Sequence, residues 1–108
     1  MQIDLPDFEN FSSFIQTNKA SLVYFSTPDC NVCKVLKPKV MELLADDFKS
    51  FVFGYVNCDT NIVTAAQNSV FSVPTLIVYV EGKGVLRKSR NIALAELNEE
   101  LSRISSFL

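Results

Sequence analysis

The stretch SLVYFSTPDCNVCKVLKP, Ser21–Pro38, contains the clearest indication of the fold. Its first part, SLVYFS, is a run of apolar and β-branched residues that predicts a buried strand. A helix is expected directly after it, because apolar residues recur at helical spacing from Cys30 to Phe48. Pro38 falls inside this helix and is expected to kink it. The expected apolar face consists of Val32, Val35, Leu36, Val40, Leu43, Leu44 and Phe48.

On either side of this stretch, the chain alternates between helical and strand patterns. A short strand is predicted at residues 2–5, and a helix follows Pro6–Asp7 with Phe8, Phe11, Phe14 and Ile15 on one face. Residues 51–58 predict a second buried strand, and residues 61–70 a short helix capped by Asn61 or Asp59. Residues 74–89 predict a hairpin with a glycine turn. The end of the chain predicts a helix that docks through an apolar stripe of Leu94, Leu97, Leu101, Ile104 and Leu108.

This order predicts an α/β fold with a mixed sheet that has helices on both faces. The chain has 108 residues, of which 48% are apolar, so we expect one domain spanning residues 1–108. The net charge is −2 and no basic block is present, which argues against nucleic-acid and membrane-surface binding. The N-terminus lacks the pattern of a signal peptide, so a cytoplasmic protein is expected.

Cys30 and Cys33 stand where the predicted strand ends and the predicted helix begins. Sites in open α/β sheets collect at the carboxyl ends of strands. The free N–H groups and partial positive charge of a helix N-terminus stabilise a thiolate, which is the nucleophilic form of cysteine. Cys30 would then be the more exposed, attacking thiol, and Cys33, one turn later, the resolving thiol.

Two other interpretations of the cysteine pair remain open at this stage. The thiols could simply be buried, as free cysteines often are. They could also form part of a zinc or iron–sulfur site. Such a site usually needs four Cys or His ligands, whereas the chain has three cysteines and no histidine. We expect no metal and no cofactor.

With these residues in view, the sequence resembles the thioredoxin family from about Leu22 to Leu101. CNVCK matches the family's dithiol and the lysine that follows it, and Pro38 matches the helix-kinking proline. Asn57–Asp59 and Val73–Thr75 match two further family motifs. The resemblance implies the thioredoxin fold and a cis peptide bond before Pro74. It also implies that Val73 offers backbone groups to a bound substrate.

The chain departs from the family pattern at several positions near the dithiol. The usual tryptophan before the first cysteine is Asp29, and the usual Gly-Pro between the cysteines is Asn31–Val32. Tyr24 stands where the family has a buried carboxylate, and Tyr55 where it has the lysine partner of that carboxylate. Arg90 stands where the family has a glycine near the dithiol. Tyrosine, with a pKa of about 10, is a poor base at neutral pH, so the family's proton acceptor for Cys33 is missing.

Two pairs of alternatives and one further expectation follow from these departures. Tyr24 and Tyr55 either bond to each other through their hydroxyls or simply fill the core. Asp29 either disfavours the Cys30 thiolate or pairs with Arg90 in a docking rim. Val32, unlike proline, keeps an N–H that would stabilise the Cys30 thiolate if it bonded to it, making the couple more oxidising than the roughly −270 mV of thioredoxin.

The sequence therefore predicts a thiol–disulfide oxidoreductase that reduces or exchanges protein disulfides through Cys30 and Cys33. The alternative is a partner-binding or redox-sensing module with little general reductase activity. Lys34 either adds positive electrostatic potential at the helix start or is simply a solvated side chain. The expected partners are protein disulfides and a reductase or small-thiol donor, and a monomer is expected. Cys58 is either a buried small residue or the site of a regulatory disulfide.

Overall fold

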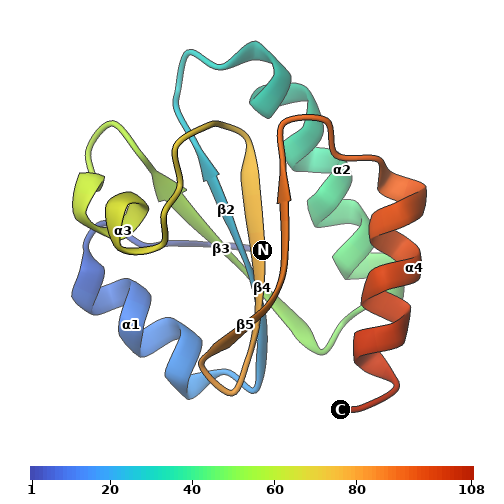
Figure 1. Cartoon of the computed structure of the whole chain (residues 1–108). Coiled ribbons are helices and arrows are strands. Elements are labelled where there is room, and N and C mark those ends of the chain that lie inside the picture. Colours follow the sequence, from blue (N-terminus) through green and yellow to red (C-terminus); the bar gives the residue numbers. More distant parts are fainter.

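A computed structural model describes residues 1–108, which fold around a five-stranded mixed sheet (Figure 1). The strands are β1 (Gln2–Asp4), β2 (Ala20–Ser26), β3 (Phe51–Asn57), β4 (Thr75–Val80) and β5 (Lys83–Ser89). The helices are α1 (Phe8–Thr17), α2 (Asn31–Asp47), α3 (Ile62–Gln67) and α4 (Leu94–Ser105). The element order predicted from the sequence is confirmed, including the short first strand.

The strands lie across the sheet in the order β1-β3-β2-β4-β5. β1 and β2 each pair with β3 in parallel, whereas β4 is antiparallel to both β2 and β5. β2 is therefore the central strand, and all seven of its residues are buried. A strand covered on both faces needs no polar alternation, which explains the continuous apolar run in the sequence.

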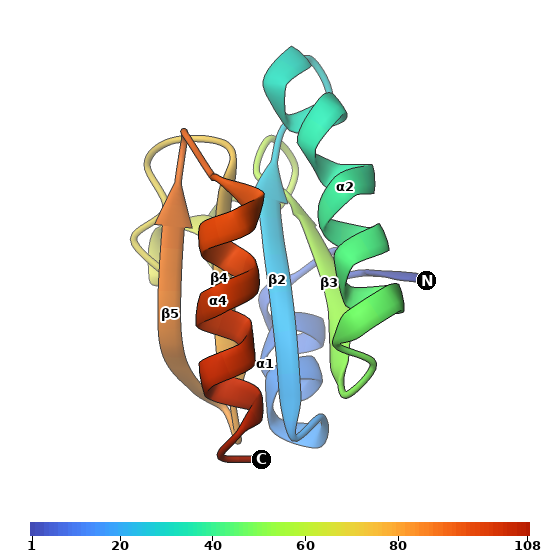
Figure 2. The ribbon, with the colours of Figure 1, turned by 90° about the vertical axis from the view of Figure 1, so that its right-hand side faces the viewer.

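The helices cover both faces of the sheet and create two cores. α2 and α4 lie on one face, and α1 and α3 lie on the other (Figures 1 and 2). Because successive strand residues point to opposite faces, Tyr24 belongs to the core under α2 and α4. Its neighbours Val23 and Phe25 belong to the core under α1 and α3. Tyr24 thus reaches the layer that contains the two cysteines.

Two helix starts agree with the sequence, since Asp7 caps α1 and Asn61, rather than Asp59, caps α3. Two expectations about buried faces are wrong. Phe8 is exposed, unlike the other predicted α1 residues. Val32 and Val35 are 62% and 61% exposed, because the opening turns of α2 extend beyond the end of β2 and only one side of them is covered (Figure 2).

None of the four helices combines the length and the apolar character that crossing a bilayer would require.

Candidate functional site

Cys30 and Cys33 form a disulfide at the start of α2, with their Cα atoms 5.3 Å apart. Cys30 is the N-cap of the helix, and its Sγ accepts the backbone N–H of Cys33 at 3.2 Å. Cys30 is partly exposed, whereas Cys33 is only 1% exposed. The helix N-terminus and this N–H both favour a thiolate on Cys30 once the disulfide is reduced.

In the disulfide, the N–H that bonds to Cys30 Sγ belongs to Cys33 and not to Val32. The bond from Val32 is a prediction for the reduced Cys30 thiolate. A cap side chain accepts from the second or third helical residue, here Val32 or Cys33, and in this structure it accepts from Cys33. A bond from Val32 to the thiolate, and with it a more oxidising couple, stays a prediction for the reduced protein.

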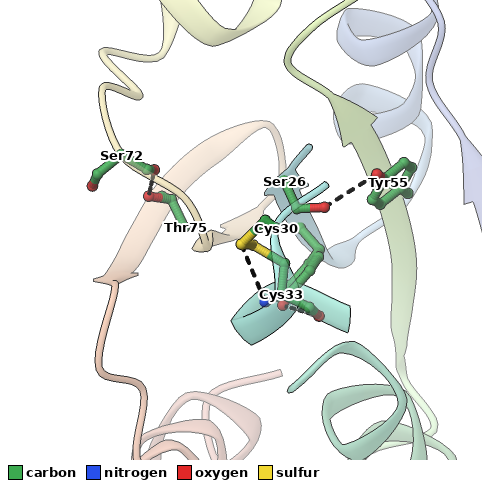
Figure 3. The surroundings of a disulfide bond; sticks show 7 residues. Ser26, Cys30, Cys33, Tyr55, Ser72 and Thr75 are labelled. Carbon is green, nitrogen blue, oxygen red and sulfur yellow. Dashed lines mark hydrogen bonds between the residues drawn. A yellow bond between two sulfur atoms is a disulfide. The ribbon is translucent and has the colours of Figure 1, made fainter. Parts of the chain in front are cut away.

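The loop before β4 lies beside the disulfide and contains a cis peptide bond between Val73 and Pro74, as the family resemblance implied (Figure 3). Thr75 fixes this loop, because its Oγ1 donates to the carbonyl of Ser72 at 2.7 Å. The same hydroxyl lies 3.0 Å from that of Ser89 on β5. Val73 is partly buried and packs against the core that contains Cys33. The loop is thus held in place next to the dithiol.

Tyr24 lies directly beneath the dithiol and is fully buried. Its hydroxyl donates to the backbone carbonyl of Cys33 at 2.9 Å. Burial, with a smaller contribution from the neighbouring Tyr55, raises the pKa of Tyr24 to about 12. Tyr24 therefore stays protonated at neutral pH and supports the backbone of Cys33 rather than accepting its proton.

Tyr55 has partners of its own, so of the two alternatives for the tyrosines, the bond between their hydroxyls is not formed. Its hydroxyl accepts from Ser26 Oγ at 3.1 Å (Figure 3). The Nζ of Lys37 lies 4.3 Å from the centre of its ring, a cation–π contact. The two tyrosines are register partners on adjacent parallel strands. That register makes them neighbours, but each hydroxyl finds a nearer partner on a different element.

Arg90 does not pair with Asp29, so the docking-rim alternative for Asp29 is not formed. The ion pairs in the structure are those of Lys88 with Glu96 and Glu100 on α4. Arg90 has a φ of +62°, a conformation that costs a residue other than glycine about 1–2 kcal/mol. Its backbone N–H donates to the carbonyl of Pro74 at 2.8 Å, which ties Arg90 to the cis-proline loop. Arg90 also lines a groove.

This groove, here called the α2 groove, has a volume of about 680 Å³ and begins at Asn31, the residue after Cys30. It is lined by residues 31, 32, 35, 36 and 39 of α2 and by residues 90–94, which lead into α4. Val32 and Val35 form part of its surface, which accounts for their exposure. Sequence reasoning missed the groove, because helical periodicity assigned both valines to the buried face.

The remaining predicted residues lie at or near the helix start. Asn31 lines the α2 groove, and the side chains of Asp29 and Lys34 are exposed. Phe71, which the sequence reasoning did not consider, is 88% exposed two residues before Val73. The signal that could have drawn attention to Phe71 was a large apolar residue just before the cis-proline loop.

Cys58 is the free cysteine and is partly buried against the core under α1 and α3. Burial, together with the nearby Asp59 carboxylate, raises the pKa of its thiol to about 11. At neutral pH this thiol is protonated and therefore a poor nucleophile. No group of three or more Cys, Asp or Glu side chains is placed to hold a metal ion.

The profile of the Thioredoxin family matches residues 4–103. The chain belongs to the thioredoxin family. The thioredoxin-like protein YdfQ of Bacillus subtilis (strain 168) is 32% identical over 95 residues, which cover 88% of this chain and 84% of that protein. The thioredoxin of Chlamydia caviae is 43% identical over 79 residues, 73% of this chain and 76% of that protein.

Solved structures agree with this membership. The X-ray structure of Fasciola hepatica thioredoxin superposes with a TM-score of 0.85 at 29% identity, over 94% of this chain and 97% of that one. Thioredoxin from Trypanosoma brucei brucei gives a TM-score of 0.86 at 23% identity, over 98% and 92% of the two chains, and shows the same fold. With its CxxC disulfide, the chain is a thioredoxin-type thiol–disulfide oxidoreductase.

Proposed function

We propose that Cys30 is the nucleophile and Cys33 the resolving thiol in the reduction of protein disulfides. The Cys30 thiolate attacks one sulfur of the substrate disulfide, and the other substrate sulfur leaves as a thiolate. Cys33, after losing its proton, attacks Cys30 Sγ and releases the second substrate sulfur. The products are a reduced substrate and the Cys30–Cys33 disulfide. The contrast between a partly exposed Cys30 at the helix cap and a buried Cys33 carries this assignment.

The second step needs a proton acceptor for Cys33. Tyr24, with a pKa of about 12, does not serve as one. Water or a group on the substrate then takes the proton, and we expect this step to be slower than in relatives with a buried carboxylate. The substituted positions around the dithiol make the chain a thioredoxin-like protein with an atypical CNVC motif.

Substrates dock against the loop that contains Val73 and cis-Pro74, where the backbone of Val73 pairs with an extended substrate segment. A reductase or a small thiol returns the disulfide to the dithiol after each cycle. We propose that the protein acts in the cytoplasm as a monomer and that residues 1–108 form one domain.

A second candidate is a partner-binding or redox-sensing module with little general reductase activity. The α2 groove next to Cys30 favours it, because an open apolar surface suits a dedicated protein partner. The lack of a buried acid beneath the dithiol also favours it, since slow resolution prolongs a mixed disulfide.

A disulfide-reduction assay with a generic protein substrate separates the two candidates. Wild type and the matched control Cys58→Ser are compared with Cys30→Ser and Cys33→Ser. Turnover by wild type and Cys58→Ser, lost in both active-site variants, supports the reductase. No turnover by wild type, together with a stable mixed disulfide on Cys33→Ser, supports the dedicated partner. Full turnover by Cys30→Ser would contradict the assignment of the nucleophile.

A further inference from the structure

We propose that the α2 groove binds an apolar segment of a partner protein that carries acidic side chains next to its disulfide. This inference rests on the proposed function, because it names the class of substrate that the same dithiol would act on. It is argued from three features of the groove, namely its apolar surface, the charge of its rim and the attachment of Arg90.

The surface of the α2 groove is mostly apolar and open to solvent. Val32 and Val35 are each more than half exposed, and Leu36, Ile92 and Leu94 line the groove with them. Apolar side chains grouped in this way next to a reactive sulfur indicate a site of protein contact. An apolar partner segment would cover them and place its disulfide beside Cys30.

The rim of the groove is positively charged. Lys39 and Arg90 line it, and no carboxylate does. Neither of these two cations takes part in an ion pair in the structure. Both charges are therefore available to an anionic partner group.

The same positive charge extends over the active-site end of α2. Residues 29–39 include three lysines and one acid, Asp29, whereas the acidic residues of α2 begin at Glu42 and lie toward its far end. The whole chain has a net charge of −2, so this end of the helix is a local positive region on an acidic protein. Such a region attracts acidic partner segments and disfavours basic ones.

Arg90 links this charge to the site of chemistry. Its backbone N–H is bonded to the carbonyl of Pro74, so Arg90 is fixed beside the cis-proline loop and also lines the groove. A guanidinium group binds a carboxylate through two parallel hydrogen bonds. A partner disulfide at the cis-proline loop would therefore bring a neighbouring Asp or Glu within reach of Arg90.

Two disulfide-linked peptides test this inference. They share one apolar sequence and differ only in two residues next to the cysteine, which are Asp in one peptide and Lys in the other. The expected kcat/KM of wild type is about tenfold higher for the Asp peptide at low salt, and this preference should shrink as salt is added. Arg90→Gln and Lys39→Gln should each reduce the preference severalfold. The matched control Lys19→Gln, outside the groove, should keep it.

Equal kcat/KM values for the two peptides, or a preference unchanged in both groove variants, would overturn the inference. Self-association of the protein in sedimentation experiments, abolished by Val35→Asp, would also overturn it, because the groove would then hold a second copy. Reduction of the neutral hydroxyethyl disulfide is measured in parallel. If that activity is present while the peptides are not distinguished, the inference about the groove fails and the proposed function stands. If neither the hydroxyethyl disulfide nor either peptide is reduced, both fail.

Discussion

Replacing Tyr24 with Phe should weaken the fold slightly and leave the chemistry unchanged. The substitution removes the hydroxyl that donates to the Cys33 carbonyl at 2.9 Å, and the ring keeps its place in the core. A carbonyl inside an α-helix also accepts the N–H four residues later, so it is not left without a partner. The cost should therefore be near the typical net value of about 1 kcal/mol. That corresponds to about a fivefold change in the unfolding equilibrium and about 4 °C in Tm.

The rate of the second step is the measurement that decides the role of Tyr24. With a pKa of about 12, Tyr24 is ionised in roughly one molecule in 100,000 at pH 7, too few to act as a base. Release of a peptide from its mixed disulfide with Cys30, followed from pH 6 to pH 9, should change less than about twofold in Tyr24→Phe. The matched control is Tyr79→Phe, which removes a buried hydroxyl bonded to Asn68 on the other face of the sheet.

Both variants should lose similar stability in urea unfolding, and both should keep the pH profile of peptide release. A drop of more than about tenfold in the release rate of Tyr24→Phe alone, with a shifted pH profile, would refute the reasoning. Tyr24 would then take part in the proton transfer from Cys33.

Three further outcomes are expected in unfolding experiments. Asn61→Ala should lower the free energy of unfolding by about 1–3 kcal/mol, because it removes the cap of α3. It also leaves the buried carbonyl of Leu5 without the Asn61 side-chain N–H that now lies 3.0 Å away. A loss below about 0.5 kcal/mol in urea unfolding would contradict this. Gly54→Ala should cost about 1–3 kcal/mol, because the added Cβ would lie 2.7 Å from the Phe14 ring; an unchanged Tm would show that the ring moves aside. The pKa of Cys58 is raised from 9.0 to about 11, so the unfolded state ionises first. Stability should therefore fall as pH rises from about 9 to 11, and Cys58→Ala should lack that part of the fall, whereas equal slopes in both proteins would argue against the raised pKa.

The fold could be predicted largely from local patterns in the sequence. The continuous apolar run of β2 indicated a strand buried on both faces, and the structure places it at the centre of the sheet. The cis peptide bond before Pro74 was predicted from the resemblance to thioredoxins and not from the spacing of residues. Both depend on features that are close together in the chain or conserved in the family's motifs.

The details of the site could not be predicted, for identifiable physical reasons. Helical periodicity placed Val32 and Val35 on the buried face, but it does not show where the sheet beneath the helix ends. Substitution patterns paired Tyr24 with Tyr55, yet register fixes only that two side chains are neighbours. The direction of each hydroxyl depends on partners from other elements, which a linear sequence does not reveal.

The hydrogen bond between Arg90 and Pro74 has a consequence for how this protein could diversify. It joins the cis-proline loop and the segment after β5 into one unit, whereas both redox cysteines belong to the segment that follows β2. Under the proposed function, the docking loop and Arg90 thus lie on a different part of the chain from the cysteines, while the other half of the α2 groove belongs to α2 itself. Changes in the loop or at Arg90 would then alter which proteins are recognised and leave the segment with the redox couple intact.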